Sequence, residues 1–110
     1  MLNQTILVGR IARDLEIKEL EDGKKASYIT LAVPRSWKNE NGEYETDFID
    51  CVLWKGVAEN TCEYWKKGDI VGSKGRLQTR TIEQEDGYIK KYMEVVAEKV
   101  TFLSSKKENE

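Results

Sequence analysis

The residue types that most often carry catalysis or hold metals are scarce in this sequence. It contains no His and two Cys, Cys51 and Cys62. His is the commonest general base, and a structural zinc ion needs four ligands, so His-based triads and structural zinc sites are excluded. Asp47 and Asp50 are the one tempting acid pair, but odd spacing on a strand sends them to opposite faces. We therefore expect no enzyme, no metal site and no cofactor, and we assign the two Cys residues no chemistry.

Aromatic side chains are the stronger candidates for function. Because side chains alternate across a strand, the segment from Thr46 to Trp54 has two faces. The face expected to fill the core carries Ile49, Cys51 and Leu53, and the outward face carries Phe48, Asp50, Val52 and Trp54. Outward rings offer surfaces on which bases stack, although a helix or a neighbouring subunit covering them is an open alternative. Trp37, just before a polar turn, is either a third such ring or a loop anchor.

A second segment, from Asp69 to Ile82, carries a cationic stripe. One of its faces holds Lys74, Arg76, Gln78, Arg80 and Ile82, and the other holds Ser73, Gly75, Leu77, Thr79 and Thr81. Basic residues are common on any solvated sheet, so the stripe alone is weak evidence. Beside outward Phe48 and Trp54, however, it supplies the cations and π faces that single-stranded nucleic acids require. A local patch is needed, because the whole chain has 18 basic and 20 acidic residues and a net charge of −2.

Three turn signals position these segments on an all-β scaffold: Asp22-Gly23, Asn41-Gly42 and Asp86-Gly87. The flanking segments predict about five strands, at Gln4–Leu15, Ala26–Trp37, Thr46–Trp54, Asp69–Ile82 and Tyr88–Leu103. Between the third and fourth strands, helical spacing predicts a short amphipathic helix over Gly56–Lys67, with Trp65 on its core side. This order is typical of the OB-fold barrel. We expect one domain over residues 1–103 and a frayed polar tail over 104–110.

The sequence contains no segment expected to span a membrane. Its longest uncharged stretch, Ala26–Pro34, is far shorter than the roughly 20 apolar residues that a membrane helix needs. The N-terminal segment places its apolar run before its arginines, the reverse of a secretory signal. We therefore expect a cytoplasmic protein with both Cys reduced and with no membrane partner.

Several segments, in this order and spacing, closely resemble the bacterial single-stranded-DNA-binding protein family over about residues 1–103. They are Leu7-Val8-Gly9-Arg10, Ile29-Thr30-Leu31-Ala32, Arg35-Ser36-Trp37, Asp47-Phe48-Ile49-Asp50-Cys51-Val52-Leu53-Trp54, Lys67-Gly68 and Gly75-Arg76-Leu77-Gln78-Thr79-Arg80. The resemblance implies a nucleoid-associated OB-fold homotetramer that coats single-stranded DNA without sequence preference in replication, recombination and repair. It implies that Trp37, Phe48 and Trp54 stack bases and that Arg10, Lys67, Arg76 and Arg80 lie near phosphates; the stripe adds Lys74 to this set.

The same resemblance, together with an exposed apolar edge, predicts how copies of the chain assemble. An unpaired apolar edge such as Ile6-Leu7-Val8 tends to find a partner. We expect dimers formed by pairing of the Leu2–Val8 edge strands, and a tetramer of such dimers, with a dimer as the fallback. The predicted interface residues are Leu2, Gln4, Ile6 and Val8.

The sequence departs from the family pattern at three places. Ile82 stands where the family usually has a stacking aromatic, so one end of the path holds bases more weakly unless Tyr88 or Tyr92 compensates. The early loop reads Asp14-Leu15-Glu16 where the family tends to have Asp-Pro-Glu. Family members also continue to an acidic, Phe-terminated tip that recruits replication and repair proteins. Ending at Glu110 predicts either a trimmed chain or a tail-less relative, such as one from a phage or mobile element.

Three competing functions remain at this stage. One is a replication-accessory OB-fold protein that acts mainly through protein contacts, which would bind bare oligonucleotide weakly. Another is an OB-fold nuclease, which would need a cluster of carboxylates for metal that is not evident in the sequence. The third is an oligosaccharide-binding protein, whose binding would be insensitive to salt because it does not need cations.

Overall fold

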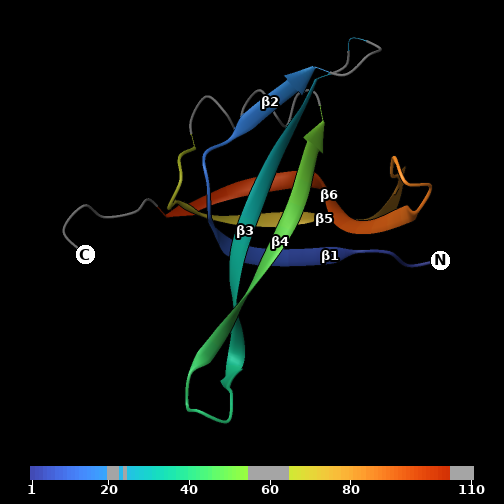
Figure 1. Cartoon of the computed structure of the whole chain (residues 1–110). Helices are drawn as coiled ribbons and strands as arrows, with labels where there is room; N and C mark the ends of the chain where they lie inside the picture. Colours follow the sequence, from blue (N-terminus) through green and yellow to red (C-terminus); the bar gives the residue numbers. More distant parts are fainter. Residues whose placement is uncertain (20–22, 24, 55–64, 105–110) are drawn as a thin grey trace.

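The computed structural model describes residues 1–19, 23, 25–54 and 65–104 as an all-β structure. The strands are β1 (Thr5–Ile11), β2 (Glu16–Glu19), β3 (Lys25–Lys38), β4 (Tyr44–Trp54), β5 (Ile70–Glu83) and β6 (Ile89–Ser104). They form a six-stranded sheet in the order β1-β5-β6-β4-β3-β2, which an additional β1–β3 pairing closes into a barrel (Figure 1). Within it, β4 and β6 run parallel. The predicted OB-fold barrel is confirmed.

The predicted first strand, Gln4–Leu15, is wrong in its length, because the chain bends within it. Residues up to Arg10 pair with β5, and Arg10 and Ile11 then pair with Ala32 and Leu31 of β3. The strand therefore passes from one neighbour to another before the chain turns into β2. Leu15, in the loop that departs from the family pattern, packs against the core. The five predicted strands thus become six segments.

Most of the predicted helix, together with Cys62 and most of the predicted tail, lies outside the described residues. The three described residues at the predicted helix end, 65–67, are not helical. Instead, the Asp69 amide donates to the Lys66 carbonyl at 3.1 Å, and Gly68 has a positive φ of 97°. Trp65 packs against the hydrophobic core, as predicted. In the described part of the chain, no helix is long and apolar enough to cross a membrane.

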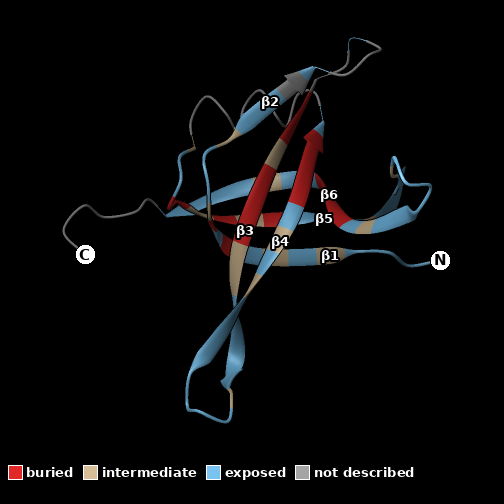
Figure 2. Ribbon diagram, in the orientation of Figure 1, coloured by how far each residue is buried: buried red, intermediate tan, exposed pale blue. Residues whose placement is uncertain are grey.

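The core fills the barrel between the first half of β3, the last part of β4 and the strands behind them (Figure 2). It contains Ile11, Ile29, Leu31, Cys51, Leu53, Val71, Val95 and Ala97. Burial raises the pKa of the Cys51 thiol to about 12, so this side chain is inert at neutral pH. The predicted core face of β4 is therefore confirmed at Cys51 and Leu53.

The outward face of β4 is covered at Val52, by residues of the same barrel rather than by a helix or a neighbouring subunit. Val52 points outward by alternation, yet only 1% of it is exposed. It forms a second apolar cluster with Ala26 and Val96, against which Tyr28 packs. Neighbouring strands supply these partners, so a pattern within β4 alone does not reveal them. Leu77 of β5 shows the opposite: it is exposed, although it lies on the same face of its strand as buried Ser73 and Gly75.

Two long hairpin arms extend from the barrel (Figure 1). The β3–β4 arm turns at Asn41-Gly42, and the β5–β6 arm turns at Asp86-Gly87. Gly42 and Gly87 have positive φ angles of 78° and 88°, a conformation that glycine adopts without steric cost. Asn39 Oδ1 accepts from the amides of Asn41 and Glu43, which fixes the first turn. These two of the three predicted turns are confirmed, and Asp22 of the third lies outside the described residues.

Candidate nucleic-acid interface

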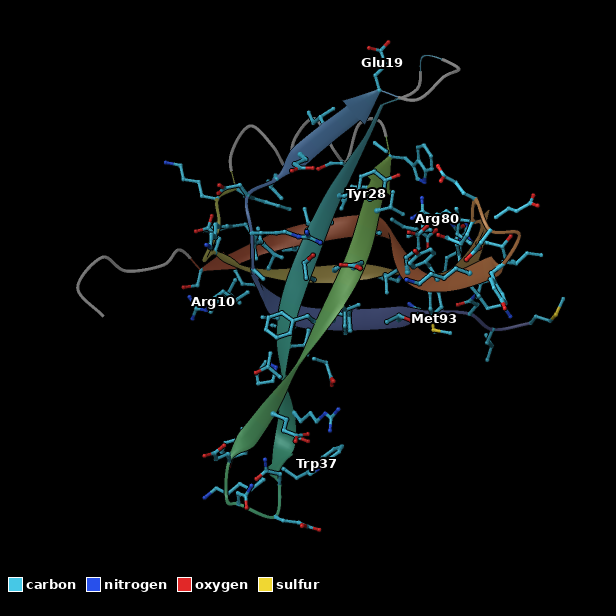
Figure 3. All side chains as sticks on the ribbon, viewed as in Figure 1. Arg10, Glu19, Tyr28, Trp37, Arg80 and Met93 are labelled. Carbon is cyan, nitrogen blue, oxygen red and sulfur yellow. The ribbon has the colours of Figure 1, made fainter. Side chains whose placement is uncertain are left out.

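Three aromatic rings predicted to stack bases lie outside the core. Phe48 is 68% exposed, Trp54 37% and Trp37 67%. Phe48 and Trp54 face outward from β4, and their direct partners on β3 are small, Ala32 and Ala26. Trp37 lies far along the β3–β4 arm (Figure 3). The outward orientation of Phe48 and Trp54 is confirmed, and their contact with DNA stays a prediction.

The predicted cations fall into two groups rather than one. On β5, Lys74, Arg76 and Arg80 are all exposed. Arg10 lies on the other side of the barrel from Arg80 in Figure 3, and its Nη1 donates to the Gly68 carbonyl at 2.7 Å, beside Lys67. Lys74 lies directly across from Ile6 of β1, a predicted interface residue. A single phosphate path along all five predicted cations is therefore not evident.

Of the β5 stripe, Arg80 lines a groove on the protein surface. This groove has a volume of about 410 Å³ and is lined by Arg13, Asp14, Glu16, Tyr28, Ile29, Asp50, Arg80 and Glu94. Arg80 lies 3.9 Å from Glu94, whose other oxygen accepts from Gln78 at 3.1 Å. The guanidinium of Arg80 also lies 5.8 Å from the centre of the Tyr92 ring. Arg13 and Arg80 thus line the same groove as Asp50, which lies between Phe48 and Trp54 on β4.

The three residues proposed for the weak end of the path lie on the β5–β6 arm. Tyr92 is the best placed, because both Arg80 and Lys90 lie over its ring, with Lys90 Nζ at 5.1 Å from the centre. Ile82 is exposed and pairs with Lys90 across the arm, and Tyr88 is exposed beside the turn. A ring with two cations above it suits both base stacking and phosphate contact. Sequence reasoning missed Lys90, which the register of the arm could have indicated.

A match to a family model identifies the group to which the chain is related. The model of the "Single-strand binding protein family" matches residues 2–103. The chain belongs to this family. Single-stranded DNA-binding protein B of Bacillus subtilis (strain 168) is 44% identical over 106 residues, which are 96% of this chain and 94% of that protein. The single-stranded DNA-binding protein of Bacillus cereus is 47% identical over 103 residues, but the chain spans only 61% of its length.

A solved structure of a family member agrees with the barrel described above. The Plasmodium falciparum SSB in complex with ssDNA superposes with a TM-score of 0.81 at 27% sequence identity. The match covers 94% of this chain and 97% of that one. Most of this chain therefore shares its architecture with an SSB that was solved in complex with ssDNA.

The β3–β4 arm also contains an ion-pair cluster that sequence reasoning did not assign. Arg35 donates from Nε and Nη2 to the two oxygens of Asp47, at 3.2 and 3.0 Å. Its Nη1 donates to Glu45 at 2.7 Å. The hydrogen bond from Arg35 holds the pKa of Asp47 below its ordinary value. Arg35 thus joins the two strands of the arm two residues before Trp37.

The predicted interface residues Leu2, Gln4, Ile6 and Val8 are all exposed. From Thr5 to Gly9, β1 pairs with β5 along one edge, and pairing with β3 begins at Arg10. A mostly apolar depression of about 370 Å³ opens beside this edge, lined by Val8, Gly9, Arg10, Ala32, Pro34, Thr46 and Ile70. Asn3 extends the β5 pairing, because its amide group exchanges two 2.9 Å hydrogen bonds with the backbone of Leu77.

Proposed function

We propose that this protein binds single-stranded DNA without sequence preference. The observation that carries the proposal is a strand with outward, exposed rings at Phe48 and Trp54, beside a groove that two arginines line, in a member of the single-strand binding protein family. Its relatives are named for the same ligand, and the similar P. falciparum protein was solved in complex with ssDNA. Bases stack on Trp37, Phe48 and Trp54, and basic side chains on β5 contact phosphates.

The biological role follows from this binding mode. Stacking contributes about 1 to 3 kcal/mol per base for any base, so the protein coats whatever single-stranded DNA is present. Such a coat protects DNA during replication, recombination and repair, in the cytoplasm and at the nucleoid. The second group of cations, Arg10 and Lys67, extends the phosphate contacts around the barrel. Copies assemble through the β1 edge into dimers and then a tetramer.

The three tryptophans of the chain provide a direct test, because a base stacked on an indole quenches its fluorescence. Saturating oligo-dT is expected to quench most emission of Trp65→Phe and little emission of the Trp37→Phe/Trp54→Phe double variant. The double variant is also expected to lose affinity. Because Phe retains a π face, the matching double alanine variant is expected to lose more.

The opposite quenching pattern would overturn the proposed path. Quenching that survives in Trp37→Phe/Trp54→Phe and disappears in Trp65→Phe would place the DNA against the segment around Trp65. A salt titration adds an independent measurement, because each phosphate contact contributes a slope of about −0.7 to log K against log salt. Binding that does not change with salt would favour a ligand without phosphates.

A further inference from the structure

Asp50 places a negative charge in the middle of the proposed base-stacking strand. It lies on the outward side of β4, between Phe48 and Trp54, and its side chain is 65% exposed. A DNA strand that runs from Phe48 to Trp54 covers about 20 Å at about 3.4 Å per residue of β4, so its phosphates pass close to this carboxylate. Like charges repel one another, and Asp50 by itself therefore opposes binding.

Arg13 reaches this carboxylate from the turn between β1 and β2. Its Nε donates to Thr30 Oγ1 at 2.8 Å, and its Nη2 lies 3.4 Å from Asp50 Oδ1. The Thr30 hydroxyl donates to the same Oδ1 at 2.9 Å, and Thr30 and Asp50 are direct partners across β3 and β4. The Thr30 hydroxyl thus bonds to both the Arg13 guanidinium and the Asp50 carboxylate and holds them in place on the wall of the groove.

The two contacts of Arg13 differ in strength. The bond to Thr30 is short, and Thr30 is buried. The contact with Asp50 is long, and both side chains are largely exposed, at 69% for Arg13 and 65% for Asp50. Exposed pairs of this kind are weak and are screened by salt. Because guanidinium has five N–H donors, Arg13 can keep its bond to Thr30 while its outer nitrogens bind another anion.

A DNA phosphate is well suited to replace the Asp50 carboxylate. Guanidinium groups bind phosphate oxygens with paired, charge-assisted hydrogen bonds. Arg80 lies on the lining of the same groove, so a phosphate that enters meets a second arginine there. The lining also holds four carboxylates, and two of them form ion pairs with these arginines: Asp50 with Arg13 and Glu94 with Arg80. Of these two, Asp50 is the exposed one that a phosphate can displace.

We infer that Arg13 is a phosphate-binding residue for which Asp50 and single-stranded DNA compete. In the free protein Asp50 holds the guanidinium, and in the complex a phosphate takes its place. Asp50 therefore lowers both the affinity for DNA and its dependence on salt. This inference rests on the proposed function, because the competition requires DNA to pass over β4.

The test is an oligo-dT titration over a series of salt concentrations with the wild type, Asp50→Asn, Arg13→Ala and the double variant. Asn keeps an oxygen that accepts from Thr30 and removes only the charge. Asp50→Asn is expected to bind roughly two- to fivefold more tightly at low salt, the range of an exposed ion pair. Its salt slope is expected to be steeper by about 0.7, because in the wild type the released Asp50 carboxylate takes up a cation and offsets the counterion freed by one phosphate contact. Adding Arg13→Ala is expected to abolish both gains.

Glu98→Gln is the matched control, since it removes one negative charge from an exposed side chain of β6 outside the groove lining. It is expected to leave the salt slope unchanged. If Arg13→Ala lowers the thermal midpoint, Arg13→Gln replaces it, because Gln retains donors without the charge.

Two results would overturn the competition. If Asp50→Asn raises the affinity for oligo-dT as much in the Arg13→Ala background as in the wild type, Asp50 acts only as a distant charge. If Asp50→Asn weakens binding, and more for oligo-dC than for oligo-dT, Asp50 accepts a hydrogen bond from a base edge instead. Either result leaves the affinity losses of Phe48→Ala and Trp54→Ala intact. If those two variants bind normally, DNA does not pass over β4, and the proposed path fails together with the competition.

Discussion

Arg35 links the two strands of the β3–β4 arm through an ion-pair cluster. It bonds to Asp47 through two nitrogens and to Glu45 through a third, near the register shift between Pro34 and Lys38. Arg35→Ala is expected to lower affinity for oligo-dT and to lower the fluorescence anisotropy of Trp37, measured with the other two tryptophans replaced by Phe. The thermal midpoint should change little, because the cluster is exposed.

Arg35→Lys separates the shape of this cluster from its charge. Lysine keeps the positive charge but cannot form the planar two-nitrogen contact with Asp47. We expect its anisotropy and affinity to lie between those of the wild type and Arg35→Ala. An unchanged Trp37 anisotropy in Arg35→Ala would show that the ring is positioned by something other than this cluster.

The Cys51 thiol makes the free energy of unfolding depend on pH in the alkaline range. Burial raises the pKa of its thiol to about 12, whereas the unfolded chain ionises near the ordinary value of 9.0. Below the lower value the thiol is neutral in both states, and its contribution to stability is fully present. Above it, the unfolded chain loses a proton that the folded chain keeps, so the free energy of unfolding falls as pH rises toward the folded pKa.

Urea unfolding at about pH 8 and about pH 10.5 measures this effect, in the wild type and in Cys51→Ala. The wild type is expected to lose more stability between the two pH values than the alanine variant. Because both proteins contain the same lysines and tyrosines, the effect of their ionisation on stability cancels in the comparison. Equal losses in the two proteins would mean that the Cys51 thiol does not couple ionisation to folding.

At the scale of the elements, Gly75 allows β6 to lie close against β5. A Cβ on Gly75 would collide with the backbone carbonyl of Val96, which cannot turn aside as a side chain can. Gly75→Ala is expected to lower the free energy of unfolding by about 1 to 3 kcal/mol or more. Gly72→Ala is the control on the same strand, since its Cβ would lie 3.7 Å from the Leu103 side chain, an ordinary contact. Equal urea midpoints for the two variants would contradict the crowding at Gly75.

Strands, turns and contacts can be predicted from the sequence when neighbouring residues determine them, and not when residues distant in the chain do. The turns at Gly42 and Gly87 and the outward rings of β4 follow from neighbouring residues, and all were predictable. The end of β1 at Ile11 depends on a change of pairing partner from β5 to β3, two strands that are distant in the chain. The Arg13–Asp50 pair likewise joins residues 37 positions apart, so no local pattern indicates it.

For the whole molecule, the edge of β1 is the place where copies are expected to join. Its exposed apolar side chains Ile6 and Val8 lie beside a mostly apolar depression. Sedimentation is expected to find dimers and tetramers of the wild type at micromolar concentration. Ile6→Lys is expected to shift them toward monomers, because charge on an edge strand opposes pairing. Ile17→Lys, on β2, is the control and should leave assembly unchanged; a wild type that is only monomeric would contradict the prediction.

The burial of Val52 on the outward side of β4 has a consequence for how the molecule opens. Around residues 51–53 the sheet is covered on both sides, by the core on one and by the Ala26, Val52 and Val96 cluster on the other. Backbone amides there should exchange with deuterium only through global unfolding, whereas amides of the exposed arms exchange through local opening. Native-state hydrogen exchange followed residue by residue would measure this difference, and fast exchange at residues 51–53 would contradict it. Trp37 would then lie on an arm that opens locally, whereas Phe48 and Trp54 lie on the strand that the two clusters keep closed.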